Sequence, residues 1–168
     1  MADDTRTAVL QAIRYGLYVA TSTDGTHRYA WAANWLTQCS FDPPAVALAA
    51  RHGTSRALMI ERGGVFAVNV MEHGQHPLVA RFYRPVEETA DDLGGVAFTP
   101  GSTGCPLLDD ALGSLECRVR DRVSGGDHVV FVGEVVDATW RRDGIPLALA
   151  DTALDYGGLH DSSRGDAG

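Results

Sequence analysis

The sequence predicts a mainly β fold, with six or seven strands in an antiparallel barrel and only short helices. Segments of strand length follow one another too closely for the long crossovers that parallel strands need. Several segments are apolar on both faces, which requires a barrel interior on one side and a second cover, such as a partner subunit, on the other. The 168 residues, of which 45% are hydrophobic, suit one domain with one sizeable core.

Composition argues against several classes of function. The formal net charge of −8 disfavours nucleic acid or an anionic membrane as a partner. The 3 cysteines lack the paired spacing of a disulfide framework or a zinc site. No apolar run approaches the ~20 residues that span a bilayer, and the first residues lack the apolar core of a secretory signal, so we expect a cytoplasmic protein. All 14 basic residues are arginine, so a side-chain cation that holds a phosphate would be Arg or His.

In the first half of the chain, the pattern predicts two helices and three strands. Val9, Leu10 and Ile13 share one face of the first helix. A Thr/Ser start and a Gly-Gly stop bound the second helix. The predicted helices cover residues 5–14 and 54–64, and the predicted strands cover residues 17–23, 27–35 and 43–51.

In the second half, one short helix and four strands are expected. The helix covers 75–83, and the strands cover 64–71, 114–123, 128–140 and 145–151. Residues 84–112, rich in Pro, Gly and acids, are expected to form a long irregular connection. Along 114–123 the alternation places Leu115, Cys117 and Val119 inward and places Glu116, Arg118 and Arg120 outward. We expect a single domain over 1–160 and a flexible tail over 161–168.

Five segments, in this order, carry a family resemblance: NWLTQCSFDPPAVALAA, GGVFAVNVM, QHPLVARFY, LGSLECRVRDRV and GGDHVVFVGEVV. Together they resemble the flavin reductase-like family of FMN-binding split-barrel proteins, over about residues 8–158. The resemblance implies a six-stranded antiparallel split barrel of Greek-key type. It also implies a homodimer with flavin at the subunit interface, and NAD(P)H as the hydride donor. No G-x-G-x-x-G or P-loop motif accompanies it.

The resemblance implies that residues 32–40 contact the flavin ring. Small side chains there let a ring approach the backbone, and polar groups can reach its edge. The alternative is an ordinary strand that leaves the core for a turn at Asp42-Pro43-Pro44. The candidate ring contacts are Ala33, Asn34, Trp35, Thr37, Gln38, Cys39 and Ser40.

A phosphate site is expected near residues 50–57. A helix begins at Thr54 or Ser55, where free N–H groups and the helix dipole favour an anion. Arginines flank this position and can hydrogen-bond phosphate oxygens. The alternative is a normal helix start with two solvated arginines. The candidates are Ala50, Arg51, Ser55 and Arg56.

His128 is the candidate catalytic residue, because the resemblance implies that the histidine of the Gly-Asp-His segment lies near flavin and nicotinamide. It could donate a hydrogen bond or, when protonated, balance a negative charge there. Asp127 could fix its tautomer or cap the turn. Phe82 and Tyr156 are further candidates near the flavin, and core packing is the alternative for each.

Three functions follow from the resemblance. The first is a reductase that supplies reduced flavin, by diffusion, to a partner monooxygenase. The second is an FMN-holding oxidoreductase that acts on another small molecule, and the third is a flavin-binding electron carrier without NAD(P)H turnover. The residues leave open FMN or FAD, and NADH or NADPH. Many relatives have a serine where Trp35 stands. The Trp35 indole either forms one wall of the flavin slot or makes the slot too narrow for FAD.

Overall fold

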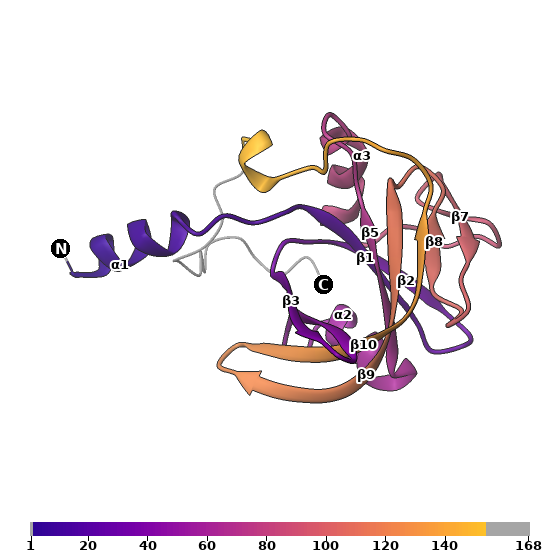
Figure 1. The fold of residues 1–168 in the computed structure, drawn as a ribbon, viewed down its shortest axis with the longest axis horizontal. Helices are drawn as coiled ribbons and strands as arrows, with labels where there is room; N and C mark the ends of the chain where they lie inside the picture. Colours follow the sequence, from indigo (N-terminus) through magenta and orange to yellow (C-terminus); the bar gives the residue numbers. More distant parts are fainter. Residues whose placement is uncertain (1, 154–168) are drawn as a thin grey trace.

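The computed structural model describes residues 2–153, which form one seven-stranded antiparallel sheet with a smaller sheet and short helices (Figure 1). The mainly β, antiparallel class predicted from the sequence is confirmed. In chain order, the strands of the large sheet are β1 Tyr18–Thr23, β2 Arg28–Ala33, β3 Leu36–Phe41, β4 Pro44–Arg51, β5 Val65–Val70, β9 Gly113–Gly125 and β10 His128–Trp140. Their spatial order is β2-β1-β5-β9-β10-β4-β3.

The helices are short, as predicted. The α-helices are α1 Ala2–Gln11, α2 Ser55–Gly63 and α3 His76–Val79, and the 3-10 helices are η1 Ala80–Tyr83 and η2 Leu149–Asp151. α1 projects away from the body of the domain (Figure 1). α2 packs against β1, β2, β4 and β5, and so contacts the edge strand β2 and also β4, which lies next to the other edge.

One core fills the interior that the sheet and α2 surround. Its buried residues come from β1, β2, β4, β5, β9, β10 and α2: Ala20, Trp31, Ala33, Val46, Leu48, Ala50, Ala57, Ile60, Phe66, Val68, Cys117, Val129 and Phe131. Six strands that contribute to one cluster are what a barrel interior requires. The predicted inward position of Cys117 is confirmed, since its side chain is fully buried.

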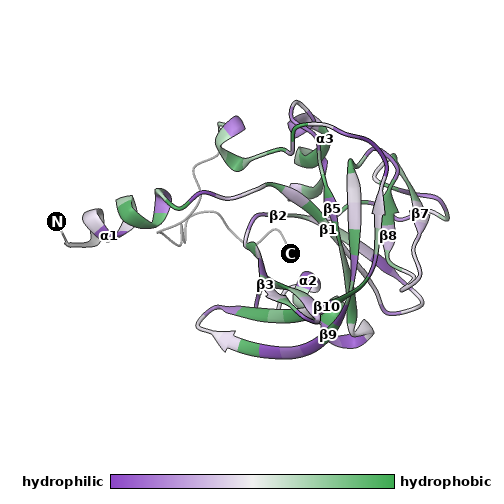
Figure 2. Ribbon diagram, viewed as in Figure 1, coloured by the Kyte–Doolittle hydropathy of each residue, from purple (hydrophilic) through white to green (hydrophobic). Residues whose placement is uncertain are grey.

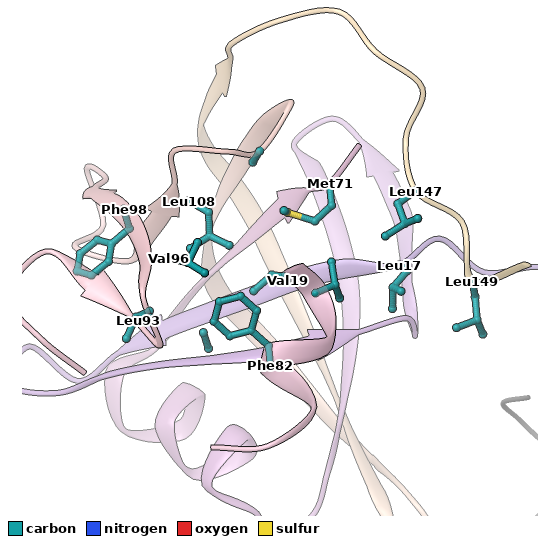
Figure 3. Close-up of a cluster of buried hydrophobic side chains, with 13 residues drawn as sticks. Leu17, Val19, Met71, Phe82, Leu93, Val96, Phe98, Leu108, Leu147 and Leu149 are labelled. Atoms are coloured by element: carbon teal, nitrogen blue, oxygen red, sulfur yellow. The ribbon is translucent and has the colours of Figure 1, made fainter. Parts of the chain in front are cut away.

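A second core lies on the outer side of β1 (Figure 3). It joins Leu17 and Val19 to the α3–η1 segment and to the connection that follows. Phe82 belongs to this core and is 1% exposed. The structure therefore places Phe82 in a hydrophobic core, which was the alternative to a flavin contact.

Four local predictions need correction. The strand expected over 27–35 ends at Ala33, and an unpredicted strand, β3, follows. The connection over 84–112 is not irregular, because it contains the three-stranded sheet of β6 Asp92–Leu93, β7 Val96–Pro100 and β8 Pro106–Leu108. In place of the strand expected over residues 145–151, the structure has two isolated β-bridges followed by η2.

Glu116 is the fourth correction, because its side chain is buried at 2% exposure instead of facing solvent. Its carboxylate accepts hydrogen bonds from the backbone N–H and hydroxyl groups of Ser102 and Thr103, at 2.6–3.2 Å. The β7–β8 loop thus folds over β9 and supplies the donors that a buried carboxylate needs. Alternation along a strand cannot reveal such a cover, because the loop belongs to a different segment of the chain.

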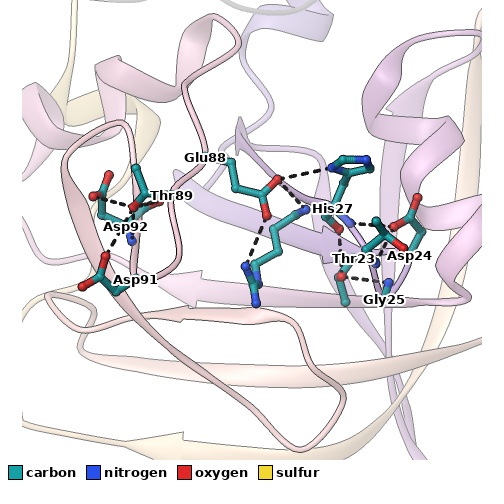
Figure 4. A network of polar contacts seen from close by, with 10 residues as sticks. Thr23, Asp24, Gly25, His27, Glu88, Thr89, Asp91 and Asp92 are labelled. Atoms are coloured by element: carbon teal, nitrogen blue, oxygen red, sulfur yellow. Dashed lines mark hydrogen bonds and ion pairs between the residues drawn. The ribbon is translucent and has the colours of Figure 1, made fainter.

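Glu88 ties the connection before β6 to the start of β2 (Figure 4). Its carboxylate accepts hydrogen bonds from the Arg28 backbone N–H and guanidinium, at 3.0 and 3.2 Å. Asp24 caps the β1–β2 turn by accepting from the N–H groups of Thr26 and His27. These contacts fix β2, whose far end leads to the candidate site.

Candidate functional site

A hollow lies where the β2–β3 corner meets the end of β4 and the start of β10. It is lined by Trp31, Ala32, Ala33, Asn34, Trp35, Ala49, Ala50, Arg51, Arg56 and His128. Its volume is about 30 Å³. The residues come from four strands or their ends and from α2, so the barrel fold itself assembles the hollow.

Strand pairing brings the polar residues of the hollow together. His128 and Arg51 are direct partners in the β10–β4 ladder. The His52 N–H donates to the Asp127 carbonyl at 2.9 Å, which joins the two chain segments beyond the ladder. The Ala49 N–H donates to the Trp35 carbonyl at 3.0 Å and fixes the backbone of the β2–β3 corner against β4.

His128 is held between two groups. Its ring lies against the Trp35 indole, with ring centroids 4.6 Å apart and planes inclined by 49°. Its Nδ1 lies 2.8 Å from Asp127 Oδ1. This contact lowers the pKa of the Asp127 carboxyl. A carboxylate only accepts, so Nδ1 carries the proton and Nε2 is left for other partners.

Asn34 places a buried polar atom at the same corner. Its Nδ2 is shielded from solvent and has no hydrogen-bond partner among residues 2–153. A buried amide donor without an acceptor is costly in a folded protein, so such groups commonly meet a ligand or an ordered water. Asn34 Nδ2 is therefore suited to an acceptor on a bound molecule.

Two arginines surround the start of α2. Arg51 and Arg56 both line the hollow, while Ser55 is exposed and does not. Thr54, the N-cap residue, makes no side-chain cap and donates its hydroxyl to the Arg51 carbonyl at 2.7 Å. The first turn of α2 thus has no side-chain cap, which leaves its N–H groups suited to an anion.

The sequence-predicted residues divide into two groups. The structure brings Ala33, Asn34, Trp35, Ala50, Arg51, Arg56 and His128 together around the hollow. It does not place Thr37, Gln38, Cys39, Ser40, Ser55 or Phe82 on the lining. Thr37, Gln38 and Cys39 lie exposed on β3, and Phe82 is in the second core. Tyr156 lies outside the described residues.

Sequence reasoning missed Trp31 and Ala49 as lining residues. Ala49 had a usable signal, because it is two residues before Arg51 on β4 and therefore shares its face. Ala49 also pairs directly with Val130, two residues after His128 on β10. Trp31 had the same signal, because it is two residues before Ala33 on β2, although its side chain also belongs to the barrel core.

The face that carries the hollow continues as a half-exposed apolar surface. Ala47 and Ala49 on β4 pair with Val132 and Val130 on β10, and all four are partly exposed. Figure 2 shows the first half of β10 as mostly hydrophobic, beside a more hydrophilic end of β9. This apolar sheet face is a candidate interaction surface.

Residues 2–153 contain no group of three His, Cys, Asp or Glu side chains arranged to hold a metal ion. In the same part of the chain, no helix is long and apolar enough to cross a membrane.

The chain matches the flavin reductase like domain over residues 10–158. It is 31% identical over 125 residues to a "Probable flavin reductase" of Rhizobium meliloti (strain 1021), covering 74% of this chain and 39% of that protein. It is 32% identical over 123 residues to "Diflavin flavoprotein A 1" of Synechocystis, covering 73% of this chain and 22% of that protein. The chain thus spans well under half the length of these curated relatives.

Solved structures with the same fold include flavin reductases. BorF, the flavin reductase component of a bacterial two-component tryptophan halogenase, superposes with a TM-score of 0.78 at 25% identity, covering 94% of this chain and 98% of that chain. The NADH:FAD oxidoreductase SgcE6 of Streptomyces globisporus, in complex with NAD and FAD fragments, gives 0.74 at 28% identity, covering 86% and 85%. The chain belongs to the flavin reductase-like family.

Proposed function

We propose that the protein is an NAD(P)H-dependent flavin reductase that binds FMN or FAD against the hollow beside His128. The observation that carries the proposal is the meeting of Asn34, Arg51, Arg56 and His128 at one corner of a flavin reductase fold. The solved NADH:FAD oxidoreductase with NAD and FAD fragments supports the pairing of a nicotinamide with a flavin.

The residues at the hollow suit a flavin nucleotide. Ala32, Ala49 and Ala50 offer short side chains, over which a flat ring can lie close to the backbone. The buried Asn34 Nδ2 can donate to a carbonyl oxygen on the ring edge. Arg51, Arg56 and the uncapped start of α2 suit a phosphate.

The chemistry of the reaction belongs to the cofactors. When bound, a flavin accepts a hydride at N5 from C4 of a nicotinamide. The protein's part is to align the two rings, exclude water and balance charge. His128 is suited to the last task, because its Nδ1 is engaged by Asp127 and its Nε2 can donate when protonated.

A single chain supplies only part of such a site. The hollow holds about 30 Å³, whereas pockets that enclose a ligand are commonly about 300–1,000 Å³. The adjoining apolar surface of Ala47, Ala49, Val130 and Val132 favours a second copy as the other wall. We therefore place the flavin between the two chains of a homodimer.

The reduced flavin has two possible destinations. BorF and the styrene monooxygenase flavin reductase from Pseudomonas putida S12 favour release to a separate monooxygenase. The diflavin flavoprotein relatives favour a second candidate, in which electrons pass to another domain of a longer protein. The shallow hollow favours release, because it encloses little of a ligand's surface.

An anaerobic assay tests this function. Purified protein is mixed with NADH or NADPH, with and without added FMN or FAD, and absorbance is followed at 340 nm and 450 nm. We expect nucleotide oxidation and flavin bleaching in step, only when protein, flavin and nicotinamide are all present. No reaction with any of the four combinations, from a folded preparation, contradicts the proposed function.

A further inference from the structure

We propose that a pocket at the C-terminal end of α2 binds a small organic carboxylate, and that Arg118 pairs with its anionic group. The pocket lies between the β1–β2 turn, the end of α2, the start of β5, β9 and the β7–β8 loop. Its volume is about 400 Å³, and cavities that enclose a small molecule commonly hold about 300–1,000 Å³. It shares no lining residue with the hollow beside His128, so the inference does not depend on the proposed function.

Strand pairing brings two arginines to opposite sides of this pocket. Arg28 pairs with Thr23 across β2 and β1. Arg118 pairs with Val65 across β9 and β5. Because β1 and β5 are neighbours, the four residues form one row across the strand order β2-β1-β5-β9. Neighbouring strands lie about 4.8 Å apart, so roughly 14 Å separates the two arginine backbones, which leaves room for a small molecule between them.

Arg118 and Val65 both face the outer side of the sheet, where the pocket lies. The next residue before Arg118 is Cys117, and the next residue after Val65 is Phe66. Both of these neighbours are buried in the barrel core, and successive residues of a strand face opposite sides. The pocket therefore has an apolar floor at Val65 beside a cation, which suits a molecule with an apolar body and an anionic group.

Arg118 is the lining cation that remains for a ligand. The Arg28 guanidinium is already engaged by Glu88, at 3.2 Å. Within residues 2–153, the Arg118 guanidinium makes no hydrogen bond or ion pair. Glu116, two residues earlier on β9, has its carboxylate engaged by the β7–β8 loop. A guanidinium can meet a carboxylate with two parallel hydrogen bonds, so Arg118 is suited to a bound organic acid.

The charge of the pocket favours a ligand with a single negative charge. Asp24 lines the opposite side, at the β1–β2 turn (Figure 4). Its carboxylate accepts hydrogen bonds from the backbone N–H groups of His27 and Thr26, at 2.8 and 2.9 Å, and these bonds hold the pKa of the carboxyl below its usual value. Repulsion from Asp24 disfavours a phosphate dianion and directs a carboxylate to the β9 end of the pocket.

Contacts within the protein fix the walls of the pocket. The Glu116 carboxylate holds the β7–β8 loop, which contributes Thr103 and Gly104 to the lining, against β9. The end of α2 packs directly on the end of β1, since a Cβ atom at Gly63 would overlap the carbonyl oxygen of Thr23. Because the walls are ordered before a ligand arrives, binding costs little additional ordering of the protein.

Titration of ¹⁵N-labelled protein with sodium benzoate, followed by amide chemical shifts, tests the proposal. Benzoate is the probe because it joins one carboxylate to an apolar ring. We expect saturable shifts at the amides of Thr26, Gly104 and Arg118. Arg118→Ala should weaken benzoate binding about tenfold or more, because charge-assisted hydrogen bonds are lost. Arg118→Lys, which keeps the charge without the planar fork, should fall between the parent and the alanine variant.

Arg120→Ala is the matched control, because Arg120 is also on β9 but is engaged by Glu134 and does not line the pocket. It should leave the benzoate Kd unchanged. Absence of saturable shifts at the pocket amides, or equal benzoate binding by the parent and Arg118→Ala, overturns the proposal. Tighter binding of inorganic phosphate than of benzoate at these amides overturns the assignment to a carboxylate.

A competition experiment separates this pocket from the flavin site. Saturating FMN should leave the benzoate Kd unchanged, because the two sites share no lining residue. Displacement of benzoate by FMN would place benzoate beside His128 and overturn the proposal. Benzoate binding at the pocket amides, in a protein that binds neither FMN nor FAD, would support this pocket and contradict the proposed flavin site alone.

Discussion

The imidazole of His128 lies between the indole of Trp35, at 4.6 Å between ring centroids, and the carboxylate of Asp127, at 2.8 Å from Nδ1. The two contacts define which atom of the ring is left for chemistry. With Nδ1 engaged by the carboxylate, only Nε2 can serve a bound molecule.

His128→Ala should lower kcat/KM for the nicotinamide by about tenfold or more, because a donor to the reacting pair is lost. The measurement is steady-state oxidation of NADH at saturating FMN. His27→Ala is the control, since His27 is on the exposed β1–β2 turn at the other end of β2. Unchanged kcat and KM for His128→Ala would remove this residue from the reaction.

Arg51→Ala should weaken FMN binding about tenfold, which corresponds to ~1.4 kcal/mol and is what a modest ionic contact contributes. Riboflavin, which lacks the phosphate, should bind parent and variant equally. Arg62→Ala is the matched control, because Arg62 is an exposed arginine in the last turn of α2, opposite the end beside Arg51. If FMN titration curves of parent and Arg51→Ala coincide, the phosphate lies elsewhere.

The cysteines should differ sharply in reactivity. Burial raises the pKa of Cys105 to about 11 and of Cys117 to about 12, so both remain protonated thiols at pH 8. Cys39 is exposed on β3. Because the thiolate is the reactive form, Ellman's reagent at pH 8 should modify one thiol per native chain and three after denaturation. Rapid reaction of a second thiol in the native protein would contradict the described packing.

Glu116→Ala should destabilise the fold by about 2–3 kcal/mol, because the loop donors of Ser102 and Thr103 lose their acceptor. Glu116→Gln should cost less, since one amide oxygen still accepts. Glu134→Gln, which alters an exposed ion pair with Arg120, serves as the control and should have a smaller effect than either. Denaturant unfolding measures all three, and equal stability of Glu116→Ala and the parent would contradict a structural role for this carboxylate.

The sequence alone was enough to locate the helices and strands that have a clear hydrophobic periodicity or residues typical of their ends. Helix α2, between Thr54 and the glycines that end it, and the long strand β10 are where the pattern predicted them. Strand β3 was missed because its middle residues are polar and exposed, so it lacks the apolar alternation that marks a strand. Strands β6–β8 were missed because they are short and lie among Pro, Gly and acidic residues.

Only part of the candidate site could be predicted from the sequence, because strand pairing decides which residues line it. Asn34, which begins the first matched segment, and Arg51, which follows it, do line the hollow. Thr37, Gln38 and Cys39 share that motif, but β3 carries them out along an exposed edge strand. The ladder between β4 and β10 selects the lining, and a pairing between strands so distant in sequence cannot be read from either strand alone.

The central claim is that a flavin ring lies beside His128 where two copies of the barrel meet. A crystal structure of the protein grown with FMN tests it most directly. The account predicts the isoalloxazine against Ala49 and His128, with its phosphate at Arg51 and Arg56 and a second chain covering the other face. Flavin bound elsewhere, or a second chain packed on β4 and β10 that seals the hollow, would contradict it.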